Sequence, residues 1–189
     1  MSAGSARPTR HDAVDRLAAP VTVLTVCHAG RVHGTTVSSL TTVSQEPLLL
    51  TASLQEGSAF AHLALSEGRF AVNVLSSGQG AAARRFADGH RPAGAAQFDG
   101  LAWRPDRYSR APLLEGALAH YACRVRGSFL LGDHEVLLGL VVRADGGPSG
   151  APLLSYGGEL VTGTPESTTS SPPYVPDFHD IHPRERTAL

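Results

Sequence analysis

The chain has 189 residues, which fits the roughly 100–200 residues of one domain and is enough to bury a sizeable core. Its 16 basic residues, all arginine, balance 17 acidic residues to a formal net charge of −1, which argues against a nucleic-acid-binding protein and against binding to an acidic membrane surface. The cysteines, Cys27 and Cys123, are far apart and indicate neither a zinc site nor a disulfide framework. Because the sequence shows no secretory signal and no membrane-length apolar run, we expect a cytoplasmic protein.

The first half of the chain predicts short elements separated by turn signals. Thr9 can begin a helix that Pro20 ends. Runs of β-branched and apolar residues predict strands, and a capping serine or small residues before a helical pattern predict helices. The expected strands are 21–27, 48–54 and 69–75, and the expected helices are 58–65 and 80–88.

The second half of the chain predicts mainly strands. Residues 117–126 and 134–144 are expected to pair in an antiparallel hairpin around Gly132 and Asp133, and a last strand is expected near 152–156. We therefore divide the chain into a flexible N-terminus (1–9), one domain (10–161) and an extended tail (162–189) rich in Pro, Ser and Thr. Strands separated by turns, with few short helices, favour a mainly β fold with a closed or nearly closed antiparallel barrel.

Several short motifs resemble known sites, but their context argues against them. Residues 78–83 fit the dinucleotide fingerprint G-x-G-x-x-A, yet no parallel strand is expected after the helix that they open. Asp133 and His134 are not interpreted as part of a catalytic triad, because neighbours on a strand point to opposite faces. His179 and His182 could bind a metal, but they lie in the tail, and we expect no metal site.

The stretch GTTVSSLTTVS, residues 34–44, contains seven hydroxyl side chains in eleven residues. Ser and Thr are common in loops, where they hydrogen-bond the backbone, and Thr and Val also suit strands. A third interpretation is a binding loop for an anionic ligand rich in oxygen. Composition alone does not choose among these three.

A combination of segments carries a resemblance to a known family. The segments 20–54, FAVNVLSS (70–77), GALAHYACRV (116–125) and GDHEVLLGLV (132–141) occur in the order of the flavin reductase family. The sequence resembles this family over about residues 10–161. The resemblance implies a homodimer with the antiparallel split-barrel fold that binds FMN or FAD and oxidises NADH or NADPH, often to supply a partner flavin-dependent monooxygenase.

The resemblance also implies the residues of the site. His134 is the expected catalytic-site residue and would orient the dihydronicotinamide rather than act as an obligate base. The hydroxyl-rich segment would lie along the flavin, and a basic residue of the 80–88 helix would reach its phosphate. The residues expected to bind the cofactors are Thr36, Val37, Ser38, Ser39, Ser44, Ser53, Leu54, Ser58, Arg84, Arg85, Phe86 and Tyr156.

Two other functions remain open at the level of sequence. One is a flavoprotein that holds its flavin tightly and uses it on an organic substrate. The other is a non-enzymatic flavin-binding or partner-docking protein, suggested by Glu46, where the family commonly has proline, and by an altered segment around Tyr156. In the second case a carboxylate near the site would oppose a nucleotide phosphate.

Overall fold

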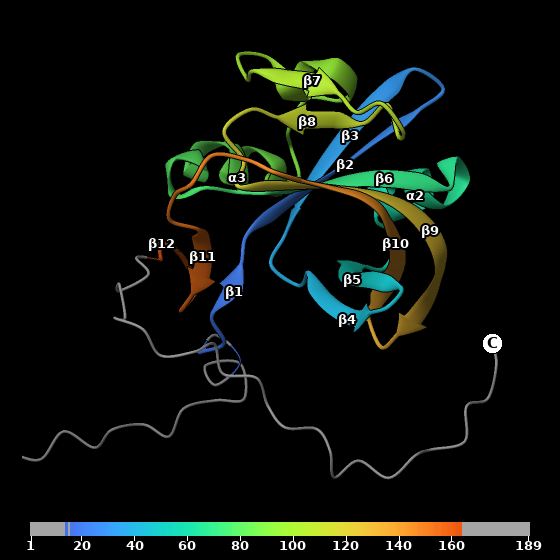
Figure 1. Ribbon diagram of the computed structural model, residues 1–189, viewed down its shortest axis with the longest axis horizontal. Coiled ribbons are helices and arrows are strands. Elements are labelled where there is room, and N and C mark those ends of the chain that lie inside the picture. Colours follow the sequence, from blue (N-terminus) through green and yellow to red (C-terminus); the bar gives the residue numbers. More distant parts are fainter. Residues whose placement is uncertain (1–13, 15, 164–189) are drawn as a thin grey trace, which may run out of the picture.

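The computed structural model describes residue 14 and residues 16–163 (Figure 1). Several predicted features lie wholly or largely outside these residues. They are the N-terminal segment 1–9, the helix expected after Thr9, and His179 and His182 of the tail. The predicted domain boundaries stay predictions.

A seven-stranded sheet forms the centre of the molecule, with the strand order β3-β2-β6-β9-β10-β5-β4. Its strands are β2 (Thr22–His28), β3 (Arg31–Val37), β4 (Thr41–Gln45), β5 (Leu48–Gln55), β6 (Arg69–Val74), β9 (Ala119–Leu131) and β10 (His134–Gly146). Every pairing within it is antiparallel. The predicted strands and the β9–β10 hairpin are confirmed, and the described residues contain none of the parallel pairing that a dinucleotide-binding fold requires.

The sheet curls into a barrel that stays open along one side. The two long strands β9 and β10 bend strongly (Figure 1), and their register shifts at Leu138/Gly139 and at Val141/Arg143. Such bulges increase the bending and twist of a strand. β3 and β4 are the two edges of the sheet order, and only residues 38–40 connect them along the chain. The barrel is therefore split between its two edge strands, β3 and β4.

Two α-helices form where the sequence predicts them. α2 (Ala59–Glu67) begins after Ser58, whose hydroxyl accepts a hydrogen bond from the backbone N–H of Ala61, and ends at Gly68 in the left-handed conformation. α3 (Gly80–Ala87) follows the short 3-10 helix η1 (Ser77–Gln79). Neither helix has the length and hydrophobicity needed to cross a membrane, and the same holds throughout the described residues.

Smaller elements lie outside the seven-stranded sheet, and only one of them was predicted from the sequence. They are the hairpin of β7 (Trp103–Pro105) with β8 (Pro112–Leu114), the 3-10 helix η2 (Gly94–Phe98), and a sheet of β1 (Ala19–Pro20), β11 (Leu153–Tyr156) and β12 (Glu159–Thr162). The strand predicted near 152–156 is confirmed as β11. The others are two to five residues long and stand among Pro, Gly and Arg, so no periodicity marks them.

The hydrophobic core fixes which residues of β5 face outward. Leu50, Ala52 and Leu54 are buried in the main apolar cluster together with Phe60, Phe70 and Leu137. Because side chains alternate along a strand, Ser53 and Gln55 lie on the opposite face of β5. This face borders the split.

The segment after α3 is fastened to β3 at Gly34. Gln97, which is fully buried, accepts a hydrogen bond from the N–H of Gly34 at 3.2 Å, and Arg91 donates to the carbonyl of Gly34 at 2.9 Å. The imidazole of His33 lies between them, with Nδ1 3.2 Å from Nε2 of Gln97 and Nε2 3.3 Å from Nη2 of Arg91. Donor groups thus face both ring nitrogens, and this arrangement disfavours a protonated imidazole.

The environment of His33 predicts a pH-dependent stability. Burial, and then the charge of Arg91, lower the pKa of His33 from 6.5 to about 4. Between these values the unfolded chain binds more protons than the folded one, so the free energy of unfolding should fall as the pH decreases. We expect a loss on the order of 1–2 kcal/mol for this half-buried group, allowing for solvent screening. Urea unfolding at neutral pH and at about pH 4.5 measures it.

The control is His90, whose side chain is fully exposed. His33→Gln should flatten the pH dependence of the free energy of unfolding relative to the unsubstituted chain, whereas His90→Gln should not. An equal slope in the His33→Gln variant would show that this histidine does not couple folding to protons.

Candidate active site in the split of the barrel

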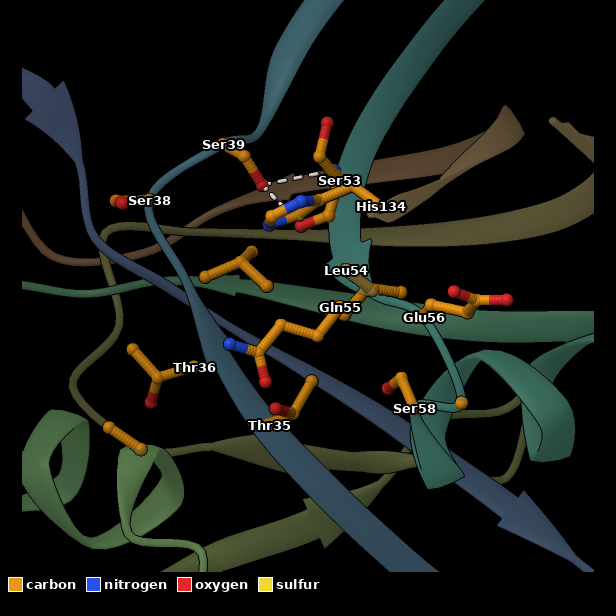
Figure 2. A pocket seen from close by; sticks show the side chains of 13 residues that line it. Thr35, Thr36, Ser38, Ser39, Ser53, Leu54, Gln55, Glu56, Ser58 and His134 are labelled. Carbon is orange, nitrogen blue, oxygen red and sulfur yellow. Dashed lines mark hydrogen bonds between the residues drawn. The ribbon is translucent and has the colours of Figure 1, made fainter. Parts of the chain in front are cut away.

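A pocket of about 500 Å³ lies at the split of the barrel, lined by the end of β3 and the end of β5 (Figure 2). We call it the hydroxyl pocket. Its lining residues are Thr35, Thr36, Val37, Ser38, Ser39, Ser53, Leu54, Gln55, Glu56, Gly57, Ser58, Ala87 and His134. The volume falls within the roughly 300–1,000 Å³ of small-molecule sites.

One wall of the pocket is the chain that leaves β3. Consecutive residues from Thr35 to Ser39 line this space; the first three are the end of β3, and Ser38 and Ser39 begin the connection to β4. The hydroxyl of Thr36 donates to the carbonyl of Ala83 at 2.8 Å, which ties α3 to this wall. Ser38 is exposed and presents its hydroxyl without a partner among the described residues.

The opposite wall is joined to the first by a reciprocal pair of hydrogen bonds. The hydroxyl of Ser39 donates to the carbonyl of Ser53 at 2.8 Å and accepts from the N–H of Ser53 at 3.0 Å (Figure 2). The pairing of β4 with β5 reaches Thr41 and Thr51, so Ser39 satisfies the backbone of β5 just beyond the end of that ladder. It holds the two walls at a fixed distance.

Replacing Ser39 with alanine is expected to lower the free energy of unfolding by about 1–3 kcal/mol, because the N–H and carbonyl of Ser53 both lose their partner in a half-buried place. Chemical denaturation measures the loss. Ser38→Ala is the matched control for stability, since Ser38 is exposed and should change it by less than about 0.5 kcal/mol. Equal stabilities of the two variants would contradict the bridging role of Ser39.

The turn from β5 into α2 forms the floor of the pocket. Gly57 and Ser58 lie at the N-terminus of α2, where backbone N–H groups and the helix dipole favour an anionic group. The N–H of Glu56 donates to the carbonyl of Asp133 at 3.0 Å, which connects this turn to the β9–β10 turn. The carboxylate of Glu56 is the fixed negative charge among the lining residues.

His134 enters the pocket from the first residue of β10. Its Nδ1 lies 2.8 Å from Oδ1 of Asp133, and its side chain is 43% exposed. The prediction that these neighbours point apart is wrong, because Asp133 lies in the turn before β10, where strand alternation does not apply. The hydrogen bond from His134 lowers the pKa of Asp133. No hydroxyl among the described residues hydrogen-bonds to His134, so the pair orients an imidazole and is not part of a triad.

The lining residues suit a ligand with many oxygen and nitrogen acceptors. Hydroxyls from three segments, with backbone N–H groups at the end of β3 and the start of α2, can donate to such a ring system and to an attached phosphate. A flavin, which has an edge of N and O acceptors, fits this donor set. No arginine of the described residues lines the pocket, and Arg84 and Arg85 lie on α3, which reaches it at Ala87.

The sequence of residues 14–164 matches the family described as flavin reductase like domain. The chain belongs to this family. A NADPH-flavin oxidoreductase of Streptomyces viridifaciens is 37% identical over 168 residues, covering 82% of this chain and 87% of the relative. A reductase subunit of a flavin-dependent monooxygenase of Mycobacterium tuberculosis is 32% identical over 151 residues, with 79% and 78% covered.

A solved structure supports the same assignment. The NADH:FAD oxidoreductase of Streptomyces globisporus, determined in complex with NAD and FAD fragments, superposes with a TM-score of 0.77 at 32% identity. The match covers 84% of this chain and 93% of that one. The predicted antiparallel split barrel of the flavin reductases is thereby confirmed.

Three residues predicted to bind the cofactors of this flavin reductase do not line the pocket, and the roles given to them stay predictions. Phe86 is fully buried, with its ring 5.0 Å from that of Phe98, so it belongs to the core. Ser44 pairs with Leu49 along the β4–β5 ladder. Tyr156 ends β11 in the small three-stranded sheet. None of the three lines the hydroxyl pocket.

The two predicted arginines of α3 differ in their surroundings. Both are exposed, and α3 itself reaches the pocket at Ala87. Arg85 donates through Nη1 to the carbonyl of Asp99, which holds it against the following loop. Arg84 precedes Ala87 by three residues and therefore shares its helix face. The guanidinium of Arg84 has no hydrogen-bond partner among the described residues and lies near Gly80 at the start of α3.

Sequence reasoning missed Thr35, Gln55, Glu56, Gly57 and Ala87, which also line the pocket. Gln55, Glu56 and Gly57 fill the interval between Leu54 and Ser58, both of which were predicted, so continuity along the chain could have revealed them. Ala87 depends on how α3 packs. The concern about Glu46 was misplaced, since Glu46 is exposed outside the lining and Glu56 supplies the carboxylate of the site.

Proposed function

We propose that the hydroxyl pocket is where this chain transfers a hydride from NADH or NADPH to FMN or FAD. Flavin reduction by a nicotinamide nucleotide is the activity of its family. The observation that carries the proposal is the convergence of Thr36, Ser38, Ser39 and Ser58 with His134 around one space of suitable size. These residues come from three segments that are separate in the sequence.

The chain's own groups would hold the flavin by hydrogen bonds. Ser38 has a hydroxyl on the open side of the wall, and Thr36 and Ser39 keep acceptor capacity beside their existing bonds. A phosphate would be stabilised by the N-terminus of α2 at Ser58 and by the guanidinium of Arg84, which can bind two oxygens at once.

The bound molecules supply the redox chemistry, since hydride passes directly from the nicotinamide to the flavin. The protein contributes orientation, so that the two rings meet within reacting distance. His134, held by Asp133 through Nδ1, lines the pocket and can position the nicotinamide amide. No side-chain nucleophile is needed.

Steady-state kinetics with the purified chain test the proposal. Oxidation of NADH or NADPH should accelerate on addition of FMN or FAD, and Ser38→Ala should raise the flavin KM. Turnover that is unaffected by substitutions at Ser38 and Ser39 would place the reaction elsewhere in the chain. Flavin binding without turnover by either nucleotide would favour the non-enzymatic alternative.

We also propose that the reduced flavin dissociates and serves a partner monooxygenase. The pocket is open to solvent and several of its lining residues are exposed, which suits an exchangeable flavin. Equilibrium dialysis should give a dissociation constant in the micromolar range. A flavin that remains bound through dialysis would instead favour a prosthetic flavin acting on an organic substrate.

The proposed location is the cytoplasm, and the two free cysteines of the described residues are in keeping with it.

The proposed assembly is a homodimer. The outer face of the β9–β10 hairpin is apolar: Phe129 and Leu131 are 58% and 64% exposed, and Val136, Leu138 and Leu140 lie on the same side. An apolar face of this kind marks a contact surface. Light scattering should report a dimer, and Phe129→Asp should shift it toward the monomer.

A further inference from the structure

A second pocket, of about 480 Å³, lies between the β7–β8 hairpin and the far end of β10. We call it the arginine pocket. Its lining residues are Arg104, Arg107, Arg143 and Asp145. It shares no residue with the hydroxyl pocket, and Arg143 stands nine residues along β10 from His134, about 30 Å of extended strand at roughly 3.3 Å per residue.

The fold builds this pocket around a buried carboxylate. Asp106 is fully buried, and its Oδ2 accepts hydrogen bonds from the N–H groups of Tyr108 and Ser109 and from the hydroxyl of Ser109. Its Oδ1 accepts from Nη2 of Arg143. Asp106 thereby fixes both the loop that carries Arg107 and the guanidinium of Arg143.

Arg143 is held in one orientation with part of its donor capacity unused. Its Nε donates to Asp145 at 2.9 Å and its Nη2 to Asp106, while Nη1 has no hydrogen-bond partner within residues 16–163. Because the carboxylate of Asp145 is already paired with Arg143, it does not neutralise the other two arginines. Arg104 and Arg107 form no ion pair with any residue that the structure describes.

The arginine pocket therefore carries three guanidinium groups against two carboxylates, Asp145 in the lining and the buried Asp106 bonded to Arg143, which leaves an excess of positive charge. Guanidinium groups bind phosphate oxygens in pairs, and a preoriented arginine loses little side-chain entropy on binding. No aromatic or apolar side chain from the described chain lines this pocket, so it offers nothing for a ring to stack against. The chemistry favours a compact, multiply charged oxyanion over a whole nucleoside.

We propose that the arginine pocket is a second binding site of this protein, specific for a phosphate or diphosphate group and separate from the site of flavin reduction. The site does not depend on the proposed function of the hydroxyl pocket. Its anion can come from free inorganic phosphate or diphosphate, or from the diphosphate of a nucleotide, since both present the same oxygens.

Calorimetric titration of the full chain with inorganic diphosphate, at constant ionic strength and without flavin or nicotinamide, tests the proposal. Saturable binding at one site per chain is expected. The double variant Arg104→Gln/Arg107→Gln should bind at least roughly tenfold more weakly, about the contribution of one charge-assisted hydrogen bond. Arg31→Gln, an exposed arginine of the β2–β3 hairpin, is the matched control and should bind as the unsubstituted chain does.

Arg104 and Arg107 are chosen because both are exposed, whereas removal of Arg143 would leave Asp106 buried without its cation. Titration with ADP separates the sources: ADP binding as tight as diphosphate points to a nucleotide, and binding at least tenfold weaker points to the inorganic ion. Absence of saturable diphosphate binding, or equal binding by the double variant, would overturn the proposal. So would tighter binding of an oligo-aspartate peptide, which would assign these arginines to an acidic protein surface.

Discussion

Replacing Gly34 with alanine is expected to lower the free energy of unfolding by roughly 1–3 kcal/mol and to weaken flavin binding. A Cβ at this position would lie 2.7 Å from Cε1 and 2.8 Å from Cδ1 of Phe86. The ring of Phe86 is fully buried and packs against the ring of Phe98. The backbone of Gly34 is also fixed, since Gln97 and Arg91 bind its N–H and carbonyl. The strain would therefore reach Thr35 and Thr36 of the pocket wall.

Chemical denaturation and flavin fluorescence titration measure these two effects. Gly146→Ala is the control, because Gly146 also lies in a strand and an added Cβ there would meet nothing within 4 Å. If Gly34→Ala is as stable as Gly146→Ala, the close packing of β3 against α3 is not as described.

Replacing His134 with alanine should decrease kcat/KM for the nicotinamide nucleotide by roughly tenfold or more, equivalent to about 1.4 kcal/mol, while the flavin dissociation constant stays within about twofold. His134 lines the pocket opposite the hydroxyl wall and is held at Nδ1 by Asp133. Its loss should remove a group that positions the nucleotide but not the hydroxyls proposed to bind the flavin. Stopped-flow reduction with each nucleotide separates binding from hydride transfer.

Asp133→Asn should produce a smaller defect in the same direction, because it weakens the bond that orients the imidazole. His90→Ala is the control, since this histidine is fully exposed and lines neither pocket. Unchanged nicotinamide kinetics in the His134→Ala variant, or a large loss of flavin affinity, would contradict the role given to His134.

Much of the architecture could be predicted because its signals are local. Ser58 and Gly68 mark the two ends of α2, and the alternating residues on either side of Gly132 predict the long hairpin. Short elements such as β7 and β12 form because the barrel offers them partners, and three or four residues contain too little periodicity to reveal that.

The predicted residues that are contiguous in the hydroxyl-rich segment line the pocket, whereas lining residues that depend on packing could not be predicted. Residues 36–39 were found through the density of hydroxyl groups and the family resemblance, and all of them line the pocket. Phe86 and Ala87 are neighbours on α3, yet the helix turns the first into the core and the second toward the pocket. That rotation is set by contacts with β3, which the sequence alone does not show.

Crystals of the chain grown with FMN or FAD test the central claim most directly. We predict electron density for the flavin ring beside Thr36, Ser38 and Ser39, with the phosphate toward the N-terminus of α2. Density for a flavin bound elsewhere, with the hydroxyl pocket filled only by solvent, would contradict the account.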